Sequence, residues 1–435
     1  MTDHPTLLDL EGFAFDTIPP EQARGVILHL LSGCGPCQAA VAPYLGRSFK
    51  RSSLTVELDA AYDAAMDRAL QAVQNRRLAE ARAFVAAIPL EALDEGFAEA
   101  PAHLESPMLM QALVERSQTL RYENPAEMVR LARFAAIFTR LISAERYSQE
   151  RVTNLHFFAL TELANAYRVA DTLDEAQQVL NRATDLLGKV SDPLLRARFF
   201  IVQADIDGSN RRYAPALDTL DLAYVSYMRH GEIHLAGRTL IKKAMYVGYG
   251  GDPQGAIDLL QEGIASVDEP REPSLVASAF QNLVYWLTES GRFREARLGL
   301  WEVRKRSQFL TGRINELKIR WLEGRISAGL GELDRAERDL LYAKEGFAEA
   351  GLRYKEALAG VELGVVRLVL KRHDEAETGI LQSLDVFEEL GISYEVKRAV
   401  SLLRFAFEEK MATVGIIERF IYLLRRSEYD PNARF

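Results

Sequence analysis

Gly291-Arg292-Phe293-Arg294-Glu295-Ala296 is followed forty residues later by Gly331-Glu332-Leu333-Asp334-Arg335-Ala336. Each stretch combines a glycine turn with a helix start in which an acidic residue precedes alanine. The alanine of this motif recurs with an unbroken step of 40 residues, at Ala176, Ala216, Ala256, Ala296, Ala336 and Ala376. Chance does not maintain such a step over six units, so the pattern indicates a repeat architecture.

Other positions of the unit keep the same register. Four residues after each alanine lie Leu180, Leu220, Leu260, Leu300, Leu340 and Ile380. Twelve residues before it lie Ala164, Ala204, Ala244, Val284, Gly324 and Gly364, which are mostly small. Small residues on two antiparallel helices allow close approach, and the aliphatic residue one turn later fills the seam with the next pair. We therefore predict helical pairs that bury their apolar faces only against neighbouring pairs.

This spacing resembles the tetratricopeptide repeat over roughly residues 150–425, although the unit here is 40 residues long and the family's standard unit is 34. The resemblance implies an all-α, right-handed solenoid whose first helices line a concave, ligand-binding face. Residues 46–150 are predicted to form degenerate helical pairs, with turn-like motifs around Ala81 and Met128. Residues 151–425 form the solenoid, in which a helix over 416–426 caps the array, and residues 426–435 form a tail.

The first 45 residues contain a different motif, His29-Leu30-Leu31-Ser32-Gly33-Cys34-Gly35-Pro36-Cys37. Thiolates and imidazoles are preferred zinc ligands, and a Cys-x-x-Cys pair at a helix start can supply two of them. The motif resembles the zinc finger of anti-sigma factors, His-x3-Cys-x2-Cys, with one extra residue after the histidine. His4 is the upstream candidate for a fourth ligand. The resemblance implies one zinc ion per chain and regulation of a sigma factor or a similar partner.

Two alternatives for these cysteines stay open. Cys34-Gly35-Pro36-Cys37 has the residues of the thioredoxin active site, and Val26-Ile27-Leu28 before it has the character of a strand. Such a dithiol needs a βαβ scaffold and a helix N-terminus that lowers the pKa of the first thiol. The other alternative is purely structural, with two small buried residues in a helical hairpin.

Candidate partner-binding residues come from first-helix positions that the tetratricopeptide resemblance places on the concave face. One row, eighteen residues before the repeat alanine, carries positive charge at Arg198, Arg238 and Lys318. Other candidates on these helices are Asp205, Lys242, Tyr285, Trp321 and Arg325. A row of cations could hold the carboxylates of an acidic protein segment. The alternative is that these side chains are solvated, with their aliphatic stems packed over the seam.

Composition excludes several functional classes. The net charge of −9 over 435 residues disfavours general nucleic-acid binding. The apolar runs are too short to span a membrane, and no signal-peptide layout occurs at the start, so we expect a cytoplasmic protein. No phosphate-binding loop or catalytic triad order is visible, so we expect no enzyme. The sequence favours a protein-binding scaffold or adaptor, with an anti-sigma-like or peptide-sensing regulator as the alternative and a thiol redox protein after it.

Overall fold

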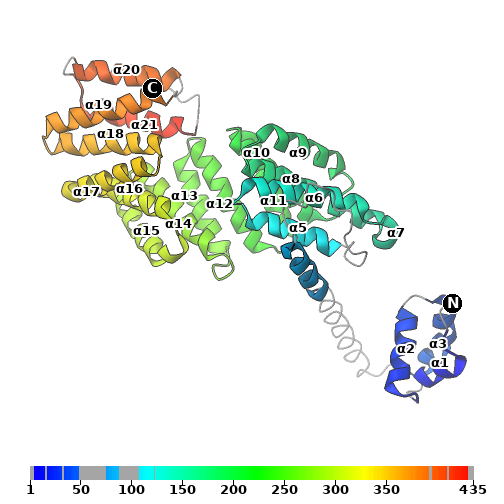
Figure 1. Ribbon diagram of the computed structural model, residues 1–435. Coiled ribbons are helices and arrows are strands. Elements are labelled where there is room, and N and C mark those ends of the chain that lie inside the picture. The colour runs from blue at the N-terminus through cyan, green and yellow to red at the C-terminus, as the bar shows by residue number, and fades with distance from the viewer. Residues whose placement is uncertain are drawn as a thin grey trace. The chain divides into compact units, whose positions relative to one another are not determined.

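The computed structural model describes residues 4–14, 17–31, 34–48, 75–87, 107–121, 123–390, 394–408 and 411–429. These residues form helices joined by turns, and none of them lies in a β-strand. The chain divides into two compact units, Met1–Ala83 and Phe84–Phe435, which are described separately below (Figure 1). Much of the region predicted as degenerate pairs, at 49–74 and 88–106, lies outside the described residues.

The described start of the first unit contains three short helices: α1 (Leu7–Ala14), α2 (Pro20–Leu31) and α3 (Gly35–Ser48). Their core is small. Leu10, Val26 and Cys37 are buried together, with Phe13 and Leu30 packed against them. A core of this size supplies little hydrophobic stabilisation, and small domains commonly need a metal or a disulfide in addition.

The second unit is an array of antiparallel helical pairs, which confirms the predicted all-α solenoid. Residues 75–87 are helical, and the last four of them belong to this unit. The next described helices are α5 (Pro107–Thr119) and α6 (Pro125–Phe138), followed by the short elements η3 (Thr139–Leu141) and α7 (Ala144–Tyr147). The repeat pairs are α8 (Gln149–Val169) with α9 (Leu173–Leu187), α10 (Pro193–Ser209) with α11 (Tyr213–Arg229), α12 (Ile233–Tyr249) with α13 (Pro253–Ser266), α14 (Pro273–Glu289) with α15 (Phe293–Lys305), α16 (Arg313–Gly329) with α17 (Leu333–Glu349), and α18 (Arg353–Val369) with α19 (His373–Glu389). The short helix η4 (Ser307–Phe309) separates α15 from α16.

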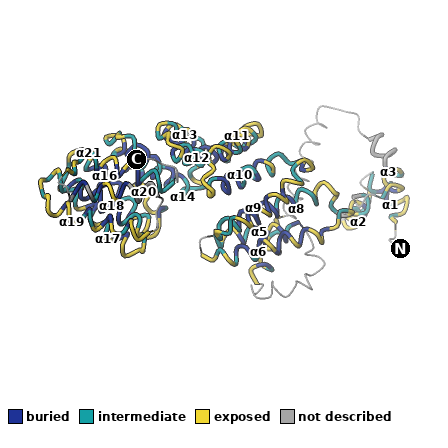
Figure 2. Tube along the Cα trace, turned by 90° about the horizontal axis from the view of Figure 1, so that it is seen from above, coloured by how far each residue is buried: buried dark blue, intermediate teal, exposed yellow. Residues whose placement is uncertain are grey.

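The repeat positions have equivalent roles in successive pairs. All six repeat alanines lie on second helices and are fully buried, and the aliphatic residues four positions later are buried too. The tube in Figure 2 shows buried segments alternating with exposed ones along these helices. Glycine is required where helices approach most closely: a Cβ at Gly324 would lie 2.8 Å from Leu340 Cγ and 3.0 Å from the Leu340 backbone nitrogen. The 40-residue period is therefore a packing period.

The turn inside each pair repeats as well. Six residues at 40-residue spacing adopt a left-handed conformation, with φ between 58° and 99°: Asp171, Arg211, Gly251, Gly291, Gly331 and Lys371. In every case the next residue donates its backbone N–H to the carbonyl five residues before it, as in Arg292 to Leu287. This geometry ends a helix by satisfying its last carbonyl groups, and glycine adopts it without strain. The glycines of the sequence motif are therefore helix stops.

The last pair differs from the others. It consists of α20 (Tyr394–Glu408) and α21 (Val414–Ser427), so the final helix is slightly longer than the predicted 416–426. Helix α21 packs on α20 and also on α18, the first helix of the preceding pair (Figure 1). Phe420 is fully buried at the predicted aliphatic position, whereas Ile416, at the alanine position, is partly buried.

Within the predicted tail, Glu428 and Tyr429 contact helices of the array. Residues 430–435 lie outside the described part of the chain. Within that part, no helix combines the length and the apolar character that a membrane span requires.

Replacing Ala296 with leucine tests the packing period. Ala296 has no exposed surface, so a larger side chain overpacks the seam between helices, and we expect a loss of about 1–3 kcal/mol in the free energy of unfolding. Urea unfolding followed by circular dichroism measures this loss. The control is Leu298→Ala on the same helix, where the side chain is 73% exposed and the expected change is within about 0.5 kcal/mol. Equal losses in the free energy of unfolding for the two substitutions would contradict the conclusion that the 40-residue period is a packing period.

Candidate metal centre and first-helix groove

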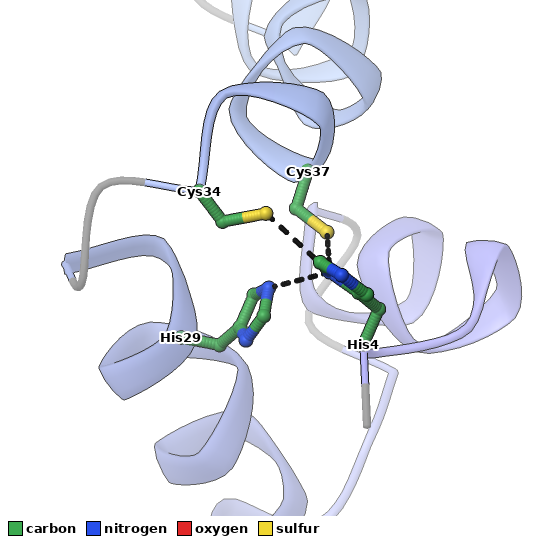
Figure 3. A group of neighbouring side chains, drawn as sticks. All are labelled: His4, His29, Cys34 and Cys37. Carbon is green, nitrogen blue, oxygen red and sulfur yellow. Dashed lines mark hydrogen bonds between the residues drawn. The ribbon is translucent and has the colours of Figure 1, made fainter. Parts of the chain in front are cut away.

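Four potential metal ligands converge in the first unit. His4 precedes α1, His29 lies in the last turn of α2, Cys34 immediately precedes α3, and Cys37 lies in its first turn. One ligand atom from each residue lies within 4.8 Å of the corresponding atoms of the other three (Figure 3). The motif residues and the upstream histidine singled out in the sequence are therefore brought together by the fold.

The three distances from His4 to the other potential ligands match those of a tetrahedral zinc site. A zinc ion about 2.0 Å from nitrogen and about 2.3 Å from sulfur separates two ligand nitrogens by about 3.3 Å and a nitrogen from a sulfur by about 3.5 Å. His4 Nδ1 lies 3.2 Å from His29 Nε2, 3.4 Å from Cys34 Sγ and 3.5 Å from Cys37 Sγ. Two imidazoles and two thiolates make a complete four-ligand set, which is the arrangement of a structural site.

The extra residue between His29 and Cys34 is accommodated by the break between two helices. Helix α2 ends at Leu31 and α3 begins at Gly35, so the histidine and the first cysteine lie on either side of the connection. Burial raises the pKa of the Cys37 thiol, and the neighbouring Cys34 raises it further. Two adjacent thiolates are unfavourable without a cation, and a bound divalent metal would offset that repulsion.

The thioredoxin interpretation fails at its scaffold. Val26, Ile27 and Leu28, which it required as a strand, lie inside helix α2. The residues that follow Cys37 belong to helix α3, and no described residue of this unit is in a strand. The Cys-Gly-Pro-Cys match therefore lacks the βαβ framework on which that dithiol chemistry depends.

A large cavity lies on the face formed by the first helices. It has a volume of about 810 Å³ and is lined by residues from α5 to α14. We call it the first-helix groove. Four of the predicted partner-binding residues line it: Arg198, Asp205, Arg238 and Lys242. Sequence register thus placed these side chains at one cavity, although partner binding itself stays a prediction.

Most of the charges in the groove are paired within the protein. Arg198 Nε lies 2.6 Å from Glu162 Oε1, and Lys242 Nζ lies 2.5 Å from Asp205 Oδ1. Burial disfavours ionisation of Glu162 and Asp205, but their cationic partners outweigh it, so the pKa of both carboxyl groups is lowered. Arg198, a member of the predicted row of cations, is therefore held by a carboxylate of the protein, and both Arg198 and Lys242 connect consecutive first helices. Arg238 is 47% exposed and lies 3.3 Å from Glu272.

A second, smaller cavity of about 130 Å³ is lined by three further residues that were predicted to bind a partner, Tyr285, Lys318 and Trp321. Arg325 lines neither of these cavities and is only 5% exposed. Its guanidinium is buried between carboxylates, and a contact of Arg325 with a partner stays a prediction.

Arg325 belongs to a buried group of four charges. Arg325 lies 2.6 Å from Glu289 and 3.3 Å from Glu362, and Arg425 of α21 pairs with the same two carboxylates. Trp321 Nε1 also donates to Glu362 Oε2 at 2.5 Å. This charge group joins α14, α16 and α18 to α21, which explains why the last helix packs against the first-helix side of the array.

The acid sensitivity of the charge group follows from Glu289. Burial opposes ionisation of Glu289, but Arg325 and Arg425 outweigh it and lower its pKa. A carboxyl group whose pKa is lowered by folding stabilises the protein fully above its ordinary pKa of 4.5. This stabilisation is lost as the pH falls through the lowered pKa of Glu289.

Sequence reasoning missed the carboxylates that pair with the predicted cations. Glu162 and Glu362 stand fourteen residues before Ala176 and Ala376, so the repeat register contained a signal for them. It also missed Tyr249 and Tyr429, whose rings stack although 180 residues separate them in the chain. No periodicity connects these two positions.

Comparison with known proteins finds similar solenoids at low identity. BtubC (BKLC) from P. vanneervenii aligns with 15% identity and a TM-score of 0.44, covering 52% of this chain and 92% of that one. A Rap protein complexed with Competence and Sporulation Factor aligns with 12% identity and a TM-score of 0.48, and the alignment covers 74% of this chain and 88% of that one. A putative kinesin light chain from Podospora anserina with TPR-like repeats aligns with 16% identity and a TM-score of 0.35, and the alignment covers 47% of this chain and 97% of that one. No family model and no curated protein matches. At TM-scores below 0.5 these similarities assign no partner to this chain.

Replacement of candidate ligands tests the metal centre. We expect the full-length protein, purified without chelator, to contain one zinc ion per chain by elemental analysis. Cys34→Ser with Cys37→Ser, and separately His4→Ala, should abolish this content because each removes part of the four-ligand set. The control is His230→Ala, an exposed histidine of the second unit that should leave zinc content unchanged. Wild-type protein without zinc, whose stability a chelator does not alter, would rule the site out.

Glu362→Gln tests the buried charge group. The substitution leaves Arg325 and Arg425 buried with one carboxylate fewer, so we expect a loss of about 3–5 kcal/mol in the free energy of unfolding. Urea unfolding measures it. Glu388→Gln is the control, since that carboxylate is 48% exposed and its pair with Arg404 should contribute at most about 1 kcal/mol. A loss at Glu362 no larger than at Glu388 would show that the group does not stabilise the array.

Proposed function

We propose that this protein is a protein-binding adaptor that captures an extended segment of a partner in the first-helix groove. The observation that carries the proposal is the groove itself, a cavity of about 810 Å³ formed by successive first helices. An extended chain presents a side chain to several repeats at once, so many weak contacts can add up to a specific complex. The proposal concerns binding, and no catalytic step is included in it.

The lining of the groove suits a segment that is both apolar and acidic. Leu194, Ile201 and Tyr227 supply apolar surface, and Arg238 supplies an exposed guanidinium. Arg198, Lys242 and Arg238 are each paired with a carboxylate of the protein, but the Arg238 side chain is the most exposed of the three, at 47% against 30% and 32%. We therefore assign the main attraction for an acidic residue to Arg238. Affinity for such a segment should decrease with ionic strength, since exposed charges are screened by salt.

A second candidate function involves the first unit. The convergence of His4, His29, Cys34 and Cys37 supports a zinc-stabilised module of short helices, which would bind a regulatory partner such as a sigma factor. In that case zinc would have a structural role, and the three-helix surface would form the interface. Transcriptional regulation through this module is the alternative to the groove-based adaptor.

Peptide selection on the full-length protein tests the adaptor proposal. We expect a displayed library of random peptides to yield binders whose affinity falls about 2–5-fold in Arg238→Glu, the size of an exposed ion pair of about 0.5–1 kcal/mol. Fluorescence anisotropy with the selected peptides measures the change. Arg198 is unsuitable for charge reversal, because a carboxylate at that position would face the buried Glu162 and destabilise the array.

The matched control is Arg229→Glu, which reverses an exposed charge in the last turn of α11 outside the groove lining. Peptides whose affinity changes equally in both charge reversals would contradict the proposal that a partner segment binds in the first-helix groove. A library that yields no binding peptide would contradict it as well. Binders that tolerate Arg238→Glu but are lost in Cys34→Ser with Cys37→Ser would instead favour the zinc-stabilised module.

A further inference from the structure

The residues that follow α21 return to the first-helix face of much earlier repeats. The ring of Tyr429 stacks on Tyr249 of α12, with centroids 3.9 Å apart and planes inclined by 12°. The Tyr213 hydroxyl donates to the Tyr429 carbonyl at 2.5 Å, and Arg211 donates to the Glu428 carbonyl at 3.3 Å. Two consecutive residues, in the turn that continues α21, therefore lie against α12 and the turn between α10 and α11, and they are held partly through their backbone carbonyls.

The same segment places a carboxylate beside two lysines. Glu428 Oε1 lies 2.7 Å from Lys355 Nζ of α18. Lys318 of α16 lines the small cavity together with Lys355 and Tyr429. Burial lowers the pKa of Lys318 and the charge of Lys355 lowers it further, whereas Glu428 acts in the opposite direction. Among the described residues Lys318 forms no ion pair, so Glu428 is paired with Lys355 alone and the Lys318 ammonium group has no paired carboxylate.

An amide in this cavity also lacks a partner. Gln281 of α14 is 9% exposed, and its side-chain Nε2 is buried without a hydrogen-bond acceptor. Gln281 lines the small cavity with Lys318 and Lys355. A buried donor without an acceptor is costly, about 1–3 kcal/mol. An oxygen of a bound ligand would satisfy it.

Aromatic side chains complete the site. Tyr249, Tyr285 and Trp321 line the cavity, and the Tyr285 and Trp321 rings lie 6.3 Å apart. Tyr249 already accepts a stacked ring, that of Tyr429. Such surfaces favour a planar aromatic residue next to the carboxylate that the lysines attract.

We propose that the small cavity binds an acidic and aromatic segment of a partner protein, and that Glu428 and Tyr429 are its internal competitor. The proposal deepens the proposed function and rests on it, because it specifies the partner segment for the same first-helix face. The partner's carboxylate would lie between Lys318 and Lys355 and accept from Gln281. Its aromatic ring would replace Tyr429 on Tyr249. Because the internal segment occupies the site, it lowers the apparent affinity for the partner.

Competition is tested with a fluorescein-labelled peptide, Gly-Gly-Ser-Glu-Tyr-Gly-Gly, and the full-length protein. We expect the double variant Glu428→Gln with Tyr429→Ala to bind this probe at least about fivefold more tightly than the wild type, because the competitor is removed. Adding Lys355→Gln to that variant should reverse the gain, and so should a probe with glutamine in place of glutamate. Fluorescence anisotropy measures affinity, and circular dichroism verifies that the variants remain folded.

Each outcome decides the inference. Equal affinity of the wild type and the double variant, or no binding to either, would overturn it. If selected peptides still depend on Arg238 while the double variant shows no gain, this inference fails and the adaptor proposal stands. If no peptide binds the groove and the probe binds neither protein, both fail together. A gain that survives Lys355→Gln would remove the proposed role of the lysines.

Discussion

Each helical pair of the array buries its apolar surface only against its neighbours, and close approach of the helices makes this burial effective. The repeat alanines have no exposed surface, and a Cβ added at Gly324 would collide with Leu340. A bulky residue at such a position would separate the helices and open the seam. Because the same restriction applies every 40 residues, the array is stabilised by a series of similar local interfaces.

The second level of organisation is electrostatic. First helices expose charged residues toward the groove, yet pairs such as Arg198 with Glu162 and Lys242 with Asp205 connect one repeat to the next. Burying an ion pair rarely adds much net stability, but breaking one leaves an uncompensated charge. These pairs therefore specify how consecutive first helices align. They also remove much of the charge that a partner could use, so recognition under the proposed function would depend on fewer groups, chiefly Arg238 and Lys318.

The final helix and the first unit both place directional interactions beside their apolar contacts. Helix α21 is fixed through Arg425, which shares the carboxylates of Glu289 and Glu362 with Arg325. The short helices of the first unit have few buried apolar residues, and their four potential ligands come from three separate places in the chain. A bound metal would compensate for the limited core of the first unit, whereas the charges of Arg425 add to the apolar residues that α21 already buries, among them Ile417, Phe420 and Leu424.

The sequence by itself determined the helical repeat, its 40-residue period, the buried alanines and the set of candidate zinc ligands. These features depend on neighbours in one dimension, so regular spacing reveals them. Only the tertiary structure decided that His4, His29 and the two cysteines converge, that Arg198 and Arg325 pair internally, and that Tyr429 reaches Tyr249. Those contacts depend on how far helices approach across repeats and on the direction of each side chain. Spacing along the chain does not contain that information.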